Sequence, residues 1–392
     1  MPLGEAVELV LERAQPLESE DVRLEAASGR TLAEPAVAVV DLPPFPSSAM
    51  DGFALRACDA PGTLPVVAAI PAGRPATRGL AEGEAMAIAT GGALPLGADA
   101  VVPIEDVDAR GDDVVIAGGV SVGDHVRTQA DDVAAGDVVV AAGVRLGASQ
   151  IGALAAAGLT KVRCARMPRV AILTTGTELR AAGEPLGSGE IYDSNGPMLA
   201  ALLLSAGAII ERVHLVRDDL PAIGAAVERG LAADVLVTTG GVSVGAHDFV
   251  RGAEAGRGVE EVFWGVAVKP GKPIAFGIRG RTLVFGLPGN PVAALVGFEL
   301  FVRPALLALQ GAADPRPPFR RGRLAQSVCR NEKRDSLLRA RSRVEDDAVA
   351  LEPLGEQGSH MIARTAMADT LVLVPCGEGA LEAGSRVAYL AL

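Results

Sequence analysis

Residues 234–248 read D-V-L-V-T-T-G-G-V-S-V-G-A-H-D. The apolar, β-branched run at 235–238 predicts a buried strand that stops at Gly240 and Gly241, and a helical pattern begins at Asp248. A strand, a glycine turn and a helix N-terminus together favour an anionic ligand, because free backbone N–H groups face it and the glycines let it approach. Many α/β proteins carry a glycine after a strand for steric reasons alone, so the stretch by itself leaves both interpretations open.

The segments on either side of this stretch alternate between strand and helix patterns. Strands are predicted at 170–173, 209–216 and 235–238, and helices at 198–205 and 221–231, the second capped by Asp219. Such alternation predicts a parallel sheet with right-handed crossovers. In a sheet of this kind the ligand crevice lies beyond the carboxyl ends of the strands, where three loops would meet: 174–178, 217–218 and 239–248.

Composition excludes several classes of protein. The 392 residues carry a net charge of -12 and only 3% aromatic residues, which disfavours binding to a nucleic acid backbone or stacking on bases. The four cysteines are scattered and form no C-x-x-C pair, so reduced thiols in a cytoplasmic protein are expected. The sequence predicts neither a signal peptide at the N-terminus nor a membrane span, because the long apolar segment 138–159 is interrupted by Arg145, Gln150 and glycines.

The rest of the chain predicts further units around the α/β domain. A helix is expected at 4–13 and another at 24–33, and a Pro-rich connector at 43–46 leads into short β-like runs. A third helix is expected at 149–158, and the hairpin around Arg279-Gly280-Arg281 precedes a long apolar helix that starts at Pro291. The fold class is therefore α/β multidomain, with a central parallel-sheet domain, β-rich accessory domains and a C-terminal β-barrel-like domain. The expected division is 1–42 plus 134–166, 43–133, 167–312 and 313–392.

The predicted sheet edge offers carboxylates and lysines. Glu178, Asp218 and Asp248 suit a hydrated Mg²⁺ that is bound mostly through ligand phosphates, while Lys269 and Lys272 supply point charges to anionic oxygens. A phosphorylated or nucleotide-bearing substrate accounts for both kinds of residue. The chain has no G-x-x-x-x-G-K-[ST] loop and no dinucleotide fingerprint. Ser243 and His247 lie too close together in one loop to predict a catalytic triad, so a loop-capping serine is favoured.

Seven motifs occur in an order that resembles the molybdopterin molybdenumtransferase family, MoeA and the E domain of gephyrin. They are S-A-M-D-G-F-A at 48–54, A-T-G-G-A-L-P-L-G-A-D-A-V-V at 89–102, T-T-G-T-E-L at 174–179, G-E-I-Y-D-S-N at 189–195, T-T-G-G-V-S-V-G-A-H-D at 238–248, K-P-G-K-P at 269–273 and L-P-G-N-P at 287–291. The resemblance spans nearly the whole chain and uses several independent motifs.

The resemblance implies an elongated, four-domain homodimer in which the opposite subunit's small domains close the site. It implies the last step of molybdenum cofactor synthesis, in which adenylylated molybdopterin and molybdate give the cofactor and AMP with a divalent cation, Mg²⁺. Expected partners beyond these substrates are the pterin adenylyltransferase and the molybdoenzymes that receive the cofactor. No nucleic acid and no membrane are expected.

The resemblance also implies site residues. The candidate catalytic residues are Asp51, Thr90, Asp132, Lys269 and Lys272. The candidate substrate-binding residues are Thr175, Gly176, Glu178, Gly240, Gly241, Ser243, Gly245, Pro288, Asn290 and Arg339. Asp218 and Asp248 are the candidate Mg²⁺ ligands on the pyrophosphate, the two lysines would offset charge on the leaving phosphate, and backbone N–H groups of 240–245 would cradle the ligand. Asp51, Thr90 and Asp132 would act on molybdate or the dithiolene end.

Three positions depart from the family pattern. Gly265 follows Trp264 where several relatives have a lysine, Arg364 stands where a serine is expected, and Ala130 replaces a glycine. Two other functions stay open. One is a homologue that inserts tungstate, or that transfers adenylyl to the pterin. The other is a pterin-binding scaffold that has lost catalysis, against which the retained Asp248, Lys269 and Thr90 argue.

Overall fold

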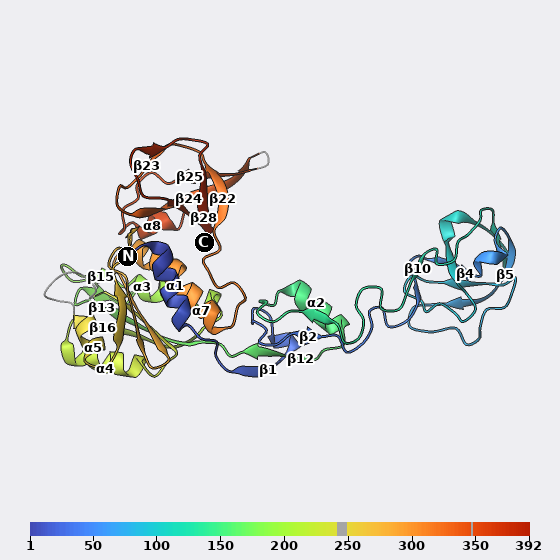
Figure 1. The fold of residues 1–392 in the computed structure, drawn as a ribbon, viewed down its shortest axis with the longest axis horizontal. Helices are drawn as coiled ribbons and strands as arrows, with labels where there is room; N and C mark the ends of the chain where they lie inside the picture. The colour runs from blue at the N-terminus through green and yellow to red at the C-terminus, as the bar shows by residue number, and fades with distance from the viewer. Residues whose placement is uncertain (241–248, 346–347) are drawn as a thin grey trace.

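The computed structural model describes residues 1–240, 249–345 and 348–392 of an elongated molecule (Figure 1). The α/β unit and the C-terminal barrel lie together at one end, and a β-rich unit lies at the other end. A small unit that contains helix α2 separates them. The predicted fold class is confirmed, including the barrel at the C-terminus.

The α/β unit is built on a six-stranded sheet of order β16-β13-β17-β21-β20-β18. Its strands are β13 (Arg169–Thr175), β16 (Ile209–Val216), β17 (Val235–Thr239), β18 (Glu260–Trp264), β20 (Ala275–Arg279) and β21 (Thr282–Leu287). The four strands β16, β13, β17 and β21 run parallel, and β20 runs antiparallel to both of its neighbours, β21 and β18. The sheet is therefore mixed, because the tight turn predicted at Gly280 joins β20 and β21 as a hairpin.

Helices cover both faces of this sheet. They are α3 (Asn195–Ser205), α4 (Leu220–Gly230), α5 (Phe249–Ala255) and the continuous rod of α6 (Pro291–Gly297), the π-helical turn η4 (Phe298–Val302) and α7 (Arg303–Leu309). Val170 and Ile172 of β13 enter the core under α3 and the rod, whereas Ala171 and Leu173 enter the core under α4 and α5. The rod is long and apolar enough to cross a membrane, but 89% of it is buried inside the protein. It is therefore the central core helix of this unit.

Helix α1 (Leu3–Arg13) forms where the sequence predicts a helix. It packs against α7, and its buried Leu3, Ala6, Val7 and Val10 join the core of the α/β unit. Helix α1 falls in the predicted domain 1–42 plus 134–166, but it packs in the core of the α/β unit, which was predicted at 167–312. The domain boundaries themselves stay predictions.

The small middle unit consists of two antiparallel strand pairs and one helix. β1 (Ser19–Arg23) pairs with β12 (Lys161–Ala165), β2 (Ala36–Val37) pairs with β11 (Val138–Val140), and α2 (Ala148–Ala156) covers them. The helix predicted at 24–33 is wrong: only the 3-10 turn η1 (Leu24–Ala26) forms. Thr31 and Leu32 form β-bridges to Arg145 and Cys164 instead, so long-range pairing takes the place of a local helix.

The β-rich unit contains a six-stranded sheet of order β7-β4-β6-β5-β9-β8. Its strands are β4 (Gly52–Leu55), β5 (Gly62–Ile70), β6 (Ala85–Ile88), β7 (Ala100–Pro103), β8 (Val107–Arg110) and β9 (Asp113–Ile116). The unit also contains the 3-10 turns η2 (Ala57–Asp59) and η3 (Ile104–Asp106). A separate antiparallel pair is formed by β3 (Ser47–Ser48) and β10 (Val126–Arg127). Two segments connect this unit to the middle unit, and they pair with each other at Leu42 and Val133. The chain therefore enters and leaves the β-rich unit side by side.

The C-terminal unit is a closed barrel. Its strands are β22 (Arg320–Leu324), β24 (Asp335–Glu345), β25 (Ala348–Pro353), β26 (Thr370–Val374) and β28 (Arg386–Ala391), accompanied by the pair β23 (Val328–Cys329) and β27 (Ala380–Leu381) and by α8 (Ile362–Thr365). The barrel closes because β24 pairs with both β25 and β26. A short strand of the α/β unit, β19 (Val268–Lys269), adds to β24 in parallel and joins the two units.

Candidate functional site

The four parallel strands of the α/β unit end at one edge of the sheet. Thr174 of β13 lies opposite Thr239 of β17, Thr239 lies opposite Leu287 of β21, and Thr175 lies opposite Val216 of β16. The loops that follow these residues therefore leave the sheet side by side. We call the loops 175–178, 217–218, 239–240 and 288–290 the strand-edge half of the site.

Gly240 is the last described residue of the stretch 234–248. Its φ is +89°, and a Cβ added there would lie 2.2 Å from the backbone oxygen of Thr175. Only glycine fits this position, because both the backbone conformation and the space exclude a side chain. Thr175 is 4% exposed, and its Oγ1 has no hydrogen-bond partner among the described residues. Four predicted residues of the following loop, Gly241, Ser243, Gly245 and Asp248, lie outside the described residues.

The loop after β13 contacts the loop after β16. The backbone N and the Oγ1 of Thr177 both donate to Oδ2 of Asp218, at 3.2 and 3.4 Å. Asp218 and Glu178 are exposed. A Cβ on Gly176 would lie 2.8 Å from Oε1 of Glu178, so that carboxylate lies against the glycine. The two predicted carboxylates therefore belong to neighbouring loops on the same edge. The loop after β13 continues into the short strand β14 (Leu179–Arg180), which pairs in parallel with β15 (Ile191–Tyr192).

The motif D-S-N at 193–195 supplies two residues that the sequence analysis quoted but did not assign to the site. Oδ1 of Asp193 accepts hydrogen bonds at 3.0 Å from the backbone N–H groups of Asn195 and Gly196, which begin α3. Oδ2 of Asp193 accepts a hydrogen bond from Oγ1 of Thr174 at 3.1 Å. Asp193 thus caps α3 and ties it to the end of β13. An aspartate two residues before a helix is a recognisable capping signal.

The loop 288–290 precedes the rod. Asn290 occupies the N-cap position of α6 and Pro291 its first turn, as predicted, although the Asn290 side chain makes no capping hydrogen bond. The N–H of Val292 instead donates to the backbone oxygen of Ser359 at 3.1 Å. A loop of the barrel therefore supports the beginning of α6 beside the strand-edge half.

The lysine turn 269–273 lies between the α/β unit and the barrel. Lys269 pairs with Ser336 of β24, and Lys269 and Lys272 are both exposed. Gly271 adopts a φ of +114°, and a Cβ there would be 3.7 Å from the backbone oxygen of Ala293 on α6. The turn is therefore adjacent to the start of α6, which places both lysines on the side of the molecule that carries the loop 288–290.

Arg339 has a different position from the other candidates, because its side chain is 0% exposed inside the barrel. Its guanidinium donates to the backbone oxygens of Glu356 (2.8 Å), Gly358 (3.3 Å) and Met361 (2.7 Å) and to Oγ1 of Thr365 (3.2 Å). Burial, and then the nearby Arg364, lower the pKa of Arg339. In this structure the residue supports the loop that contacts Val292, and its predicted contact with a ligand stays a prediction.

The β-rich unit carries a separate pair, Asp51 and Thr90, which we call the β-unit half of the site. Oδ1 of Asp51 accepts hydrogen bonds from the backbone N of Thr90 at 2.7 Å and from its Oγ1 at 3.0 Å. These two donors lower the pKa of Asp51, so the exposed carboxylate is charged at neutral pH. Asp132 lies in the connector, where its backbone N donates to the oxygen of Leu42 at 2.9 Å and its side chain is exposed.

One chain does not bring the two halves together. The β-rich unit lies at the opposite end of the molecule from the α/β unit (Figure 1). Within one chain the middle unit separates Asp51 and Thr90 from the lysine turn and from Asp218.

Positions 265, 130 and 364, which depart from the family pattern, are all described in the structure. Gly265 has a φ of +88° and Ala130 a φ of +59°. Position 265 thus takes a backbone conformation that glycine adopts most readily, while Ala130 keeps a conformation suited to the glycine of relatives. Arg364 pairs with Glu356 at 2.8 Å on the surface of the barrel.

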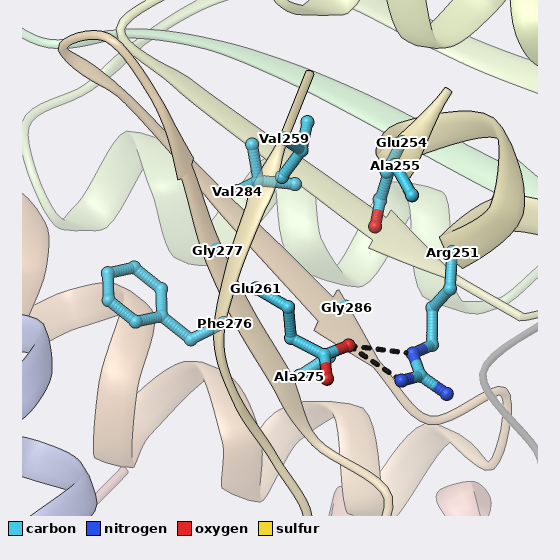
Figure 2. Close-up of a pocket in the computed structure, with 10 residues that line it drawn as sticks. All are labelled: Arg251, Glu254, Ala255, Val259, Glu261, Ala275, Phe276, Gly277, Val284 and Gly286. Carbon is cyan, nitrogen blue, oxygen red and sulfur yellow. Dashed lines mark hydrogen bonds and ion pairs between the residues drawn. The ribbon is translucent and has the colours of Figure 1, made fainter. Parts of the chain in front are cut away.

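A small cavity of about 40 Å³ lies beneath α5 (Figure 2). Arg251 of α5 reaches Glu261 of β18 through Nε at 3.0 Å and a terminal nitrogen at 2.6 Å, and its guanidinium lies 5.2 Å from the centre of the Trp264 ring. Glu254 is buried and accepts a hydrogen bond from Oγ1 of Thr238 at 3.3 Å. A cavity of this size has room for water but not for an organic substrate. These contacts fix α5, the helix that follows residues 241–248.

Within the described ranges, no three His, Cys, Asp or Glu side chains are close enough together to hold a metal ion. This arrangement is compatible with Mg²⁺, which keeps several waters and uses one or two protein carboxylates beside ligand phosphates. The exposed Asp218 is one such carboxylate at the strand edge.

Three protein-family models match the chain in order. They are the MoeA N-terminal region (domain I and II) at residues 1–158, the "Probable molybdopterin binding domain" at residues 171–308, and the MoeA C-terminal region (domain IV) at residues 321–392. The second model covers the α/β unit, including all of the strand-edge half.

Curated proteins and solved structures match over almost the full length. The chain is 37% identical over 381 residues to molybdopterin molybdenumtransferase 2 of Mycobacterium tuberculosis, with 93% of each chain covered. It is 32% identical over 391 residues to a molybdopterin molybdenumtransferase of Staphylococcus epidermidis, covering 98% of this chain and 93% of the other. The molybdopterin biosynthesis moeA protein of Pyrococcus horikoshii OT3 superimposes with a TM-score of 0.86 at 27% identity, with 100% of both chains covered.

Proposed function

The chain belongs to the MoeA-type molybdopterin molybdenumtransferase family, and we propose that it inserts molybdate into adenylylated molybdopterin to give molybdenum cofactor and AMP. In this reaction water adds across the phosphoanhydride bond, which breaks to release AMP, and two sulfur–molybdenum bonds form at the dithiolene as oxygen leaves molybdate as water. The observation that carries the proposal is the full-length match to the family, together with a strand edge whose loops suit a phosphorylated ligand.

The strand-edge half would bind the nucleotide and the pyrophosphate. Gly240 leaves space for close approach of a ligand to the backbone, and α6 points its N-terminus toward the same region. Lys269 and Lys272 would offset the negative charge that develops as AMP leaves. Thr175, Gly176, Glu178, Pro288 and Asn290 would line the ligand through the loops that meet at this edge.

Mg²⁺ would be held by Asp218 and by Asp248, and it would neutralise charge on the pyrophosphate when bound. Asp218 supports this assignment because its carboxylate is exposed and oriented by Thr177 through Oδ2. Asp248 lies outside the described residues, so its part rests on the sequence motif.

A second copy of the chain would supply the β-unit half. Asp51 and Thr90 are exposed residues of the β-rich unit, which lies at the opposite end of the elongated molecule from the α/β unit of the same chain (Figure 1). A homodimer would bring the Asp51, Thr90 and Asp132 of one subunit to the strand edge of the other, where they would act at the molybdate end. We further propose a cytoplasmic enzyme that takes its substrate from the pterin adenylyltransferase and delivers cofactor to molybdoenzymes.

The decisive experiment measures AMP release and reconstitution of a molybdenum enzyme from purified adenylylated molybdopterin. Asp218→Asn should lower the rate on the order of a hundredfold, because an amide is a poor Mg²⁺ ligand. The matched control is Asp219→Asn, one residue away, where the side chain caps α4 through Ala222 and asparagine caps equally well. Equal rates for wild type and Asp218→Asn would remove the metal role.

The same assay separates the other two functions. Cofactor formation with tungstate but not with molybdate would assign tungstate insertion. Binding of the adenylylated pterin without AMP release would identify a scaffold.

A further inference from the structure

Three segments of the strand-edge half meet at one amide side chain. Asn195 is the first residue of α3 and is 7% exposed. Its Nδ2 donates to Oγ1 of Thr239 at 2.9 Å and to the backbone oxygen of Gly289 at 2.8 Å. The amide thus joins α3, the last residue of β17 and the loop before α6.

The hydrogen bonds continue from Thr239. Its hydroxyl donates to the backbone oxygen of Pro288 at 3.0 Å, so it must accept the bond from Asn195. The oxygen of Gly289 can only accept as well. The nitrogen of the amide therefore faces both partners, and the direction of the whole chain of bonds is fixed.

The oxygen side of the amide has no partner in the part of the chain that the structure describes. Oδ1 of Asn195 is buried and has no hydrogen-bond partner among the described residues, and the same holds for Oγ1 of Thr175 at the end of the neighbouring strand. A buried amide that served packing alone would be expected to satisfy its oxygen. Among the described residues, two buried polar atoms of the strand edge thus have no partner, and one of them, Oγ1 of Thr175, lies next to Gly240.

We propose that Asn195 is a positioning residue, which holds the loop 288–290 at a fixed separation from Gly240 so that the two together accept the nucleotide-bearing pterin. This inference rests on the proposed function. It assigns to Asn195 no contact with the reacting atoms; the residue acts through Thr239, Pro288 and Gly289.

Gln310, the residue that follows α7, is a matched control, because it contacts the C-terminal end of α3. Gln310 is 2% exposed, and its Nε2 donates to the backbone oxygens of Ala206 and Leu306, each at 2.9 Å. It is therefore a second buried amide with two donated bonds, but it lies where α3 ends and not at the strand edge. Loss of either amide should destabilise the fold, whereas only loss of Asn195 should disturb the ligand loops.

The test compares Asn195→Asp with Gln310→Glu, since each change replaces a donating NH₂ by an acceptor and keeps the shape. We expect Asn195→Asp to raise the KM for adenylylated molybdopterin at least tenfold with a smaller change in kcat. Thr239→Val should shift KM in the same direction, while Thr239→Ser, which keeps the hydroxyl, should restore it. Gln310→Glu should lower the urea midpoint as much as Asn195→Asp and leave KM within twofold of wild type.

A second measurement needs no substrate. Hydrogen exchange of the backbone amides in 286–292 and at Gly240 should be at least tenfold faster in Asn195→Asp than in Gln310→Glu. An unchanged KM together with unchanged exchange in Asn195→Asp, or an equal KM shift in Gln310→Glu, would overturn the inference. If the wild-type protein releases no AMP, the proposed function fails, and the exchange result alone decides whether Asn195 holds the two loops.

Discussion

The two halves of the proposed site are built in opposite ways. The strand-edge half is assembled from loops that are far apart in sequence, and its contacts run between segments, as from Asn195 to Thr239 and Gly289. The β-unit half is one carboxylate, Asp51, held by one residue, Thr90, on the surface of a small unit. A substitution in the strand-edge half should therefore disturb several loops at once, whereas one in the β-unit half should change a single charged group.

The largest effect should come from separating the two halves on different chains. Asp51→Asn and Lys269→Ala should each lower AMP release on the order of a thousandfold, because each removes a charge from one half. A heterodimer purified through two different affinity tags, one on each variant chain, should recover about half of the wild-type rate, since one of its two sites would then be intact. A heterodimer as inactive as either homodimer would contradict a site shared between subunits.

The next largest effect should come from Gly240→Ala, which breaks the strand-edge half at its tightest point. The added Cβ would lie 2.2 Å from the Thr175 oxygen at a φ of +89°, so unfolding free energy should fall by about 3 kcal/mol and activity should be lost. Gly280→Ala is the control, because Gly280 has a φ of +59° but no atom within 4 Å of an added Cβ. Its loss, from backbone strain alone, should be about 1 kcal/mol in urea unfolding. Equal losses in the two variants would show that the contact with Thr175 is unimportant.

A smaller effect is expected at the opposite end of β17, where Asp234 connects the α/β unit to the middle unit. Its carboxylate accepts two hydrogen bonds from Arg166, at 2.6 and 2.7 Å, and one from the backbone N of Arg169 at 2.8 Å. Burial alone would raise the pKa of Asp234, but these donors outweigh it and the pKa is lowered.

A lowered pKa in the folded state stabilises the protein above the unfolded pKa of about 4, and this contribution is lost as pH falls through the folded value. Asp234→Asn should therefore cost about 2 kcal/mol of unfolding free energy at pH 7, and less near pH 3. The measurement is urea unfolding at the two pH values. A loss that is the same at pH 7 and pH 3 would contradict an ionic origin.

The smallest effect should come from Thr90→Val in the β-unit half. The variant keeps the backbone N–H donor to Asp51 but removes the hydroxyl donor, so the pKa of Asp51 should rise toward its ordinary value. The acid limb of the pH–rate profile should move to higher pH, while the rate at pH 7 falls by no more than about tenfold. Thr90→Ser should behave like wild type. A profile that is identical for all three proteins would show that Asp51 does not titrate in the reaction.

Local patterns in the sequence predict much of this fold. The apolar run of β13, the cap at Asp219 and the helix start at Pro291 each depend on neighbouring residues, and the structure confirms each of them. The same holds for the convergence of strand-end loops, because the topology of a βαβ unit places them together without knowledge of any contact.

Features that depend on distant partners were not predictable in this way. The pattern at 24–33 favours a helix locally, but Leu32 pairs with Cys164 instead. The contacts of Arg339 also come from distant residues, because its buried guanidinium donates to the backbone oxygen of Glu356, and its predicted contact with a ligand stays a prediction. Asn195 contacts Thr239 and Gly289, which lie 44 and 94 positions away in the sequence, so no local pattern predicts these contacts.

The β-rich unit is inserted into the chain between two connecting segments that pair with each other at Leu42 and Val133. The N–H of Leu42 donates to the oxygen of Val133 at 2.7 Å, and the N–H of Val133 donates back to Leu42 at 3.2 Å. Excision of residues 43–132 would therefore leave two chain ends that are already adjacent and that a short turn can join. In engineering terms, the β-rich unit is an insertion that joins the rest of the polypeptide at this single junction, so it can be exchanged without rethreading the other units.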